Sequence, residues 1–217
     1  MIKRALSEQR PWLLASLIAG ISYYFIAGSQ VPGLYQIAWK GAGVGLLAVW
    51  ALLRQRSRDA HQIGGVMALG ALGDMAIEVS MVAGAGAFLL GHLLAIRLYL
   101  RHPRGTARSS QRLAAAALIG LTPLLAWQLS GSLAAAVYAV GLGGMAGAAW
   151  LSSFPRYRVG LGAVLFVASD LLIFARLGVL ADSAVPGLLI WPLYYFGQFL
   201  ICTGVIGSLR TRPTLQS

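Results

Sequence analysis

Eight apolar stretches, each long enough to cross a bilayer as a helix, dominate this sequence of 217 residues. A helix needs about 20 consecutive apolar residues to span the hydrocarbon core of a membrane. Charged residues make up only 11% of the chain, whereas they form roughly a quarter of a soluble domain. The sequence therefore predicts an all-α, polytopic membrane protein, folded as a single integral membrane domain over residues 1–217. The eight predicted transmembrane helices are 11–28, 33–53, 62–80, 83–100, 112–129, 132–151, 158–179 and 186–208.

Basic residues alternate between the segments that connect these helices. Fourteen of the 17 Lys and Arg residues lie in every second segment, namely 1–10, 54–61, 101–112, 152–158 and 209–217. The intervening connections, near 29–32, 81–82, 130–131 and 180–185, contain neither residue type. The positive-inside rule then places the basic segments, and with them both chain termini, in the cytoplasm. We expect the bacterial cytoplasmic (inner) membrane, and this topology explains the net charge of +11 without nucleic-acid binding.

A weak internal repeat relates the first four predicted helices to the last four. Counterpart helices run in the same direction, so the pattern predicts a parallel four-plus-four duplication. Two G-x-x-x-G pairs, Gly41–Gly45 and Gly143–Gly147, favour close packing between helices. The repeated features are Gly41, Gly43 and Trp50 with Gly141, Gly143 and Trp150, Gly73-Asp74 with Ser169-Asp170, and Gly91-His92 with Gly197-Gln198.

Seven ionisable residues interrupt the apolar stretches, and most of them lie at similar predicted depths. A charge inside a bilayer costs several kcal/mol and is retained where it is used or neutralised. From the rise of a helix, Asp74 and Asp170 each lie about 18 Å from the cytoplasmic edge, too deep for a short side chain to reach water. Tyr194, Tyr195 and Gln198 fall close to the same level. The seven residues are Lys40, Asp74, Glu78, His92, Arg97, Asp170 and Arg176.

Each of these residues also has a purely structural interpretation. The long stems of Lys40, Arg97 and Arg176 allow their charges to reach the membrane surface, and Arg176 has Asp182 as an alternative partner. Glu78 is close enough to the outer surface to be solvated there. The other candidates, which could serve as hydrogen-bonded core residues, are His92, Tyr194, Tyr195 and Gln198.

The residue types disfavour two common classes of active site. The chain contains no G-x-S-x-G or H-E-x-x-H motif, and His92 is the only histidine inside a predicted helix. A serine triad and a zinc centre built on histidines are therefore disfavoured. Two buried carboxylates with a lysine, a histidine and a tyrosine remain. That set suits acid–base catalysis, or the binding and transfer of a cation or proton.

Six short segments spread across most of the chain occur in an order and spacing typical of one family. They are Lys40, Leu72-Gly73-Asp74, Gly86-Ala87-Phe88, Gly91-His92-Leu93, Phe166-Val167-Ala168-Ser169-Asp170 and Tyr194-Tyr195-Phe196-Gly197-Gln198. On these segments the chain resembles the YhhN family, the lysoplasmalogenase family of membrane proteins. It departs from the family pattern at Gly41, where a proline is usual, and at Ala95, where an aromatic residue is usual.

The resemblance implies a hydrolase that cleaves the vinyl ether bond of lysoplasmalogens, giving a fatty aldehyde and a glycerophospho-alcohol. It implies that Asp74 and Asp170 are the protonated acid and the ionised carboxylate, in an order left open, and that no metal or organic cofactor takes part. It further implies catalytic support from His92 and Lys40. The substrate would be a lysophospholipid from the bilayer, and the implied substrate-binding residues are Tyr195, Gln198, Glu78 and Tyr194.

Two other classes of function fit the same residues. A small proton- or cation-coupled transporter also carries acids and a lysine near the midplane. A lipid-binding or scaffolding membrane protein would need no turnover. For the enzyme, we expect the acidic side chains of helices 62–80 and 158–179 to face each other across one shared cavity. The oligomeric state is left open.

Overall fold

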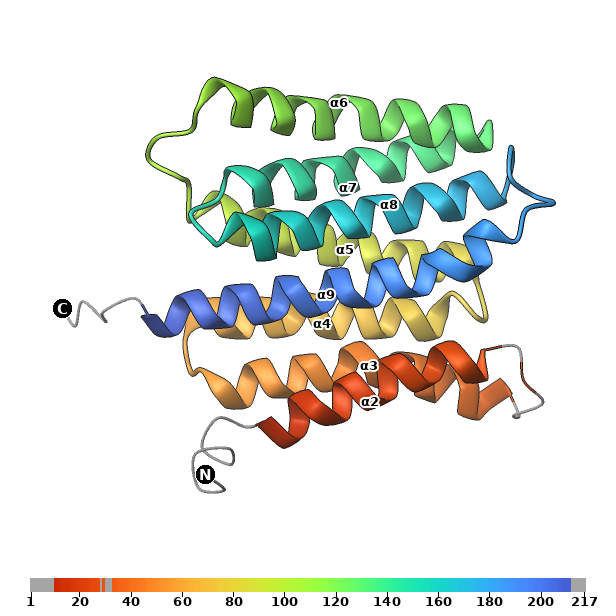
Figure 1. Ribbon diagram of the computed structural model, residues 1–217, viewed down its shortest axis with the longest axis horizontal. Helices are drawn as coiled ribbons and strands as arrows, with labels where there is room; N and C mark the ends of the chain where they lie inside the picture. The colour runs from red at the N-terminus through yellow and green to blue at the C-terminus, as the bar shows by residue number, and fades with distance from the viewer. Residues whose placement is uncertain (1–9, 28, 30–32, 212–217) are drawn as a thin grey trace.

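The computed structural model describes residues 10–27, 29 and 33–211, and this part of the chain is helical throughout, with no strand element. The predicted all-α class is therefore confirmed, and every predicted helix has a counterpart (Figure 1). Lys3, Arg4 and Arg212, on which the predicted topology partly rests, lie outside the described residues. The elements are α2 (Arg10–Ile26), α3 (Gly33–Arg54), α4 (Arg58–Ala76), α5 (Met81–Leu100), α6 (Ser109–Ser130), α7 (Leu133–Leu151), the π-helical turn η1 (Arg156–Gly160), α8 (Leu161–Arg176) and α9 (Val185–Thr211).

Six of these helices are long and apolar enough to cross a membrane: α3, α5, α6, α7, α8 with its preceding turn, and α9. The protein is thus an integral membrane protein. The α2 helix has only 17 residues, and α4 begins with the polar run Arg58-Asp59. That all eight helices span the bilayer, with both termini in the cytoplasm, stays a prediction.

The helices form one bundle, with α6 at one edge and α2 at the other (Figure 1). Between the edges, α5 packs against α4 and α7, and α9 packs against α8, α3 and α4. Among the described helices, α4 and α8 do not pack directly against each other. The connections 55–57, 101–108 and 152–155 lie together at the end of the bundle that we call the basic end.

The start of α4 corrects one predicted boundary. The sequence predicts a helix from residue 62, because the preceding residues are charged. Instead, Ser57 caps the helix by accepting a hydrogen bond from the Ala60 amide (3.2 Å), and α4 begins at Arg58. Asp74 therefore lies two residues before the end of α4, about 24 Å from its start. Its carboxylate is closer to the end opposite the basic end than the sequence predicts.

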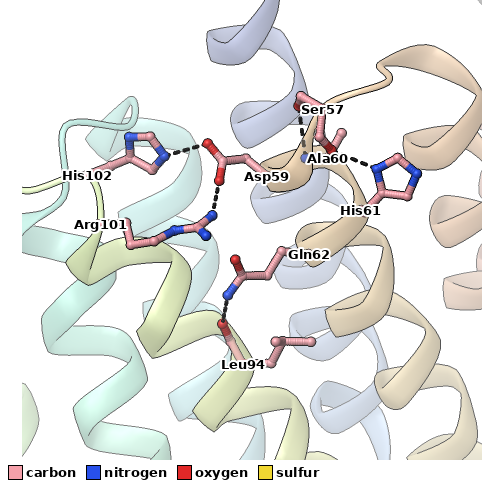
Figure 2. Close-up of polar contacts among 8 residues, drawn as sticks. All are labelled: Ser57, Asp59, Ala60, His61, Gln62, Leu94, Arg101 and His102. Carbon is pink, nitrogen blue, oxygen red and sulfur yellow. Dashed lines mark hydrogen bonds and ion pairs between the residues drawn. The ribbon is translucent and has the colours of Figure 1, made fainter.

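Ion pairing at the basic end fastens α4 to α5. Figure 2 shows Arg101 and His102, just after α5, directed toward Asp59 in the first turn of α4. His102 Nε2 lies 2.6 Å from one carboxylate oxygen of Asp59, and Arg101 donates to the other. One turn further along α4, Gln62 Nε2 donates to the Leu94 carbonyl (2.8 Å). These contacts set the register of the two helices that carry Asp74 and His92.

Glycines let the remaining helices approach closely. A Cβ added at Gly143 would lie 2.6 Å from the Leu118 carbonyl oxygen, so this residue packs α7 directly on α6. A Cβ at Gly41 would lie 2.6 Å from Met75 Cγ, where α3 meets α4. The predicted use of both G-x-x-x-G pairs in helix packing is confirmed. An equally close crossing joins α8 to α9, where a Cβ at Gly162 would lie 2.6 Å from the Gly197 carbonyl oxygen.

Candidate active site

Asp74 is paired with a tyrosine of α9. Its side chain is buried, with 2% of the residue exposed, and Tyr194 Oη donates a hydrogen bond to Asp74 Oδ2 (2.8 Å). Gly70, one turn earlier on α4, provides the space for this contact. A Cβ there would lie 2.9 Å from Gln198 Nε2 and 3.4 Å from Tyr194 Oη. Three of the predicted site residues, Asp74, Tyr194 and Gln198, thus meet at the seam between α4 and α9.

Asp170 of α8 is paired with a tyrosine of α7, which is in turn paired with His92 of α5. Tyr138 Oη of α7 donates to Asp170 Oδ2 (2.8 Å), and His92 Nε2 of α5 lies 3.0 Å from the same Tyr138 oxygen. Because a tyrosine hydroxyl has a single proton, His92 Nε2 must be the donor in its bond to Tyr138. A neutral His92 therefore has Nδ1 unprotonated, and Nδ1 has no hydrogen-bond partner among the described residues.

Aromatic rings fill the space between the two carboxylate pairs. The Phe166 ring centre lies 5.1 Å from that of Tyr194 and 5.0 Å from that of His92, so it touches both pairs. Phe88 lies edge-on to Tyr194 at 5.7 Å, and it occupies the space left by Gly73 of α4. The rings hold the two pairs in place while separating them by an apolar layer.

A cavity of about 20 Å³ adjoins these rings. His92, Gln198 and Tyr99 are its polar lining residues, and neither aspartate lines it. This cavity therefore does not join the two acids as expected. Helix α9 packs against both α4 and α8, and each carboxylate meets a tyrosine of a neighbouring helix, Asp74 that of α9 and Asp170 that of α7.

Lys40 and Glu78 form an ion pair near the end of the bundle opposite the basic end. Lys40 Nζ lies 2.5 Å from Glu78 Oε1, and the two side chains are 16% and 40% exposed. Lys40 Nζ also lies 6.0 Å from the centre of the Tyr23 ring. The lysine thus pairs with the glutamate rather than directly with Asp74 or Asp170.

Tyr195 lies apart from the other candidates, although it follows Tyr194 in the chain. Its hydroxyl lies 2.9 Å from Ser16 Oγ, and Ser16 Oγ in turn donates to the Gly43 carbonyl (2.6 Å). Its ring fills the space that Gly20 leaves in α2. Consecutive helical residues point about 100° apart, which separates the two tyrosines.

The sequence analysis missed Tyr138, which joins His92 to Asp170. A buried tyrosine hydroxyl needs a hydrogen-bond partner. Tyr138 carries the only hydroxyl inside the apolar helix α7, and that signal could have identified it. Arg97 and Arg176, by contrast, are exposed on the outside of the bundle and take no part in either pair.

A model of the YhhN family matches residues 35–205 of the chain. The chain belongs to the YhhN family. The residues of this YhhN protein that form both carboxylate pairs lie inside the matched region.

The YhhN protein also has curated relatives. A lysoplasmalogenase of Mycobacterium bovis and a lysoplasmalogenase of Mycobacterium tuberculosis are each 32% identical to it over 194 residues, covering 82% of this chain and 73% of theirs. No solved structure matches the chain significantly.

Proposed function

We propose that this protein is a membrane-embedded hydrolase that cleaves the vinyl ether bond of lysoplasmalogens or of a related ether lysolipid. The observation that carries the proposal is the 32% identity to two lysoplasmalogenases over most of the chain. Two buried carboxyl groups, each held by a tyrosine, supply the acid and the base that this reaction needs. The substrate is a lysophospholipid taken from the bilayer, and the membrane is the bacterial inner membrane, with both termini in the cytoplasm.

Vinyl ether hydrolysis begins with protonation of the double bond, continues with attack by water and ends with release of the alcohol. The acid gives its proton to the β-carbon of the double bond, whose π electrons form the new C–H bond and leave an oxocarbenium ion. Water attacks the cationic carbon and loses a proton to the base, giving a hemiacetal. The hemiacetal hydroxyl then gives its proton to the acid residue, which is ionised after the first step, as the carbon–oxygen bond to glycerol breaks. The glycerol oxygen takes the proton held by the base, and the aldehyde is released with both groups restored.

The contacts support a division of these roles. Tyr194 donates to one oxygen of Asp74, which leaves Oδ1 to carry the acid proton. Asp170 receives the Tyr138 proton, and its chain continues to His92, so it suits the base that accepts a proton from water. Gln198, beside Asp74, holds the glycerol oxygen. Lys40 acts through Glu78 near the outer surface, and the proposed chemistry needs no metal or organic cofactor.

The test is release of aldehyde from a defined lysoplasmalogen by the purified protein in lipid nanodiscs. Asp74→Asn and Asp170→Asn should each abolish release, because the amide can neither give nor take the required proton. Asp182→Asn, a control in an exposed connection, should have full activity. Absence of aldehyde with the wild type would refute the proposal. Proton-driven uptake into proteoliposomes without hydrolysis would instead identify a transporter.

A further inference from the structure

The cavity beside His92 is lined by residues of five helices, and its wall is largely apolar. Gly91 and Ala95 of α5, Met145 of α7 and Phe166 of α8 contribute to that wall. Three polar residues interrupt it. They are His92 and Tyr99 of α5 and Gln198 of α9, and all three are buried.

Two polar atoms of these residues have no partner in the part of the chain that the structure describes. Tyr99 is 1% exposed, yet its hydroxyl makes no hydrogen bond. His92 uses Nε2 toward Tyr138, and Nδ1 makes no hydrogen bond among the described residues, although only the Tyr99 hydroxyl is both unpaired and fully buried in this lining. Leaving a buried polar group unsatisfied costs about 1–3 kcal/mol. Tyr99 follows His92 by two turns, and side chains of a helix lean toward its N-terminus, so the Tyr99 ring extends back toward the level of His92.

The cavity has the size of a water site. Its volume of about 20 Å³ exceeds the roughly 10–15 Å³ that one water requires, and a buried water usually makes about three hydrogen bonds. We propose that the cavity binds the water that hydrolyses the substrate, held by Tyr99 and Gln198 and facing His92 Nδ1. This inference rests on the proposed function.

The residues already described are sufficient to carry the proton that the attacking water loses. The water oxygen bonds to the oxocarbenium carbon, and its proton passes to His92 Nδ1. His92 Nε2 gives its proton to the Tyr138 oxygen, and Tyr138 gives its own proton to Asp170 Oδ2. Histidine ends neutral in the opposite tautomer and Asp170 ends protonated, so the chain supplies a proton when the glycerol oxygen leaves. Tyr99 is a positioning residue in this scheme, because it holds the water without exchanging its proton.

The first experiment detects the water without using substrate. X-ray radiolysis of the protein in H₂¹⁸O makes hydroxyl radicals from bound water, and mass spectrometry measures oxidation of nearby methionines. Met145 lines the cavity, whereas Met67 is equally buried but does not line it. We expect Met145 to be oxidised several-fold faster than Met67. Equal rates would overturn the water site, whether or not the protein hydrolyses lysoplasmalogen.

The second experiment tests whether this water reacts. Tyr99→Phe should lower kcat about tenfold, the equivalent of one lost hydrogen bond, with KM and thermal stability unchanged. Gly91→Ala adds a methyl group at the cavity wall with only ordinary contacts, 3.6 Å from Leu69 Cβ, and should lower both kcat and Met145 oxidation.

Gly120→Ala is the matched control, because its Cβ would have no neighbour within 4 Å. It should change neither kcat nor Met145 oxidation. Rapid oxidation of Met145 together with an unchanged kcat in Tyr99→Phe would overturn the role of Tyr99. If Met145 is oxidised rapidly in a wild-type protein that releases no aldehyde, the water site is supported and the proposed function is refuted.

Discussion

The tandem tyrosines of α9 provide a sharp test of which residues form the site. Tyr194→Phe removes one hydroxyl and leaves the ring packing intact. The lost contact is the 2.8 Å hydrogen bond to Asp74 Oδ2, in a seam where both residues are buried. A hydrogen bond to a neutral carboxylic acid, the form in which Asp74 gives its proton, contributes about 0.5–1.5 kcal/mol. If it holds the carboxyl group in its reactive orientation, kcat should fall by about 2- to 13-fold.

Tyr195→Phe is the matched substitution one residue along. It removes a bond of similar length, 2.9 Å, to Ser16 Oγ, between two neutral groups and away from both aspartates. We expect it to reduce stability by about 0.5–1.5 kcal/mol while kcat stays close to that of the wild type. The sequence analysis instead places Tyr195 in the substrate site, so the pair of variants separates the two interpretations.

The assay is initial-rate aldehyde release, coupled to an aldehyde-consuming dehydrogenase, with thermal unfolding measured in the same nanodiscs. The reasoning is refuted if Tyr194→Phe has wild-type kcat, or if Tyr195→Phe loses as much activity as Tyr194→Phe. A fall in activity that follows the fall in unfolding temperature in both variants would also refute it. In that case the tyrosines act only through folding.

Three further comparisons of variants test how the bundle positions the site. Gly162→Ala should lower stability by about 1–3 kcal/mol, because its Cβ would lie 2.6 Å from a carbonyl oxygen of α9 that cannot move freely. The control Gly187→Ala places its Cβ in open space and should leave the unfolding temperature unchanged. Asp59→Asn removes the negative charge and one of the two acceptor oxygens that bind Arg101 and His102. It should lower stability by about 2 kcal/mol with KM unchanged. Lys40→Met and Glu78→Gln break the same 2.5 Å pair, so the double variant should be no slower than either single variant, and additive losses in kcat would contradict this.

The sequence predicts the helices well because a bilayer imposes their length and polarity. Each predicted span overlaps an observed helix, and the glycine pairs pack as the small-residue rule requires. The boundary of α4 is less accurate, because hydropathy assigns charged residues to connections. At Ser57 a capping side chain extends the helix through Arg58 and Asp59 instead.

The pairing of the site residues could not be predicted in the same way. Helical periodicity gives the face on which a side chain lies, but the neighbour of that face depends on the packing order of the whole bundle. Asp74 meets α9 and Asp170 meets α7 because α9 packs on α4 and α7 packs on α8. Lys40 of α3 likewise meets Glu78, just after α4, because α3 packs on α4.

The predicted four-plus-four repeat stays a prediction, although one pair of contacts agrees with it. In that alignment α5 corresponds to α9, and α7 corresponds to α3. The structure packs α5 on α7 and α9 on α3, and the aligned residues His92 and Gln198 both line the cavity.

The separation of the two carboxylates bears directly on the type of mechanism. In glycosidases, carboxyl groups about 5–5.5 Å apart allow one of them to attack the sugar covalently, whereas a wider spacing admits a water between base and carbon. Asp74 and Asp170 belong to helices that do not pack directly against each other, and each is held by its own tyrosine. Asp170 is in addition connected to His92 through Tyr138. Water activated through His92 therefore fits this arrangement better than a covalent intermediate on either aspartate.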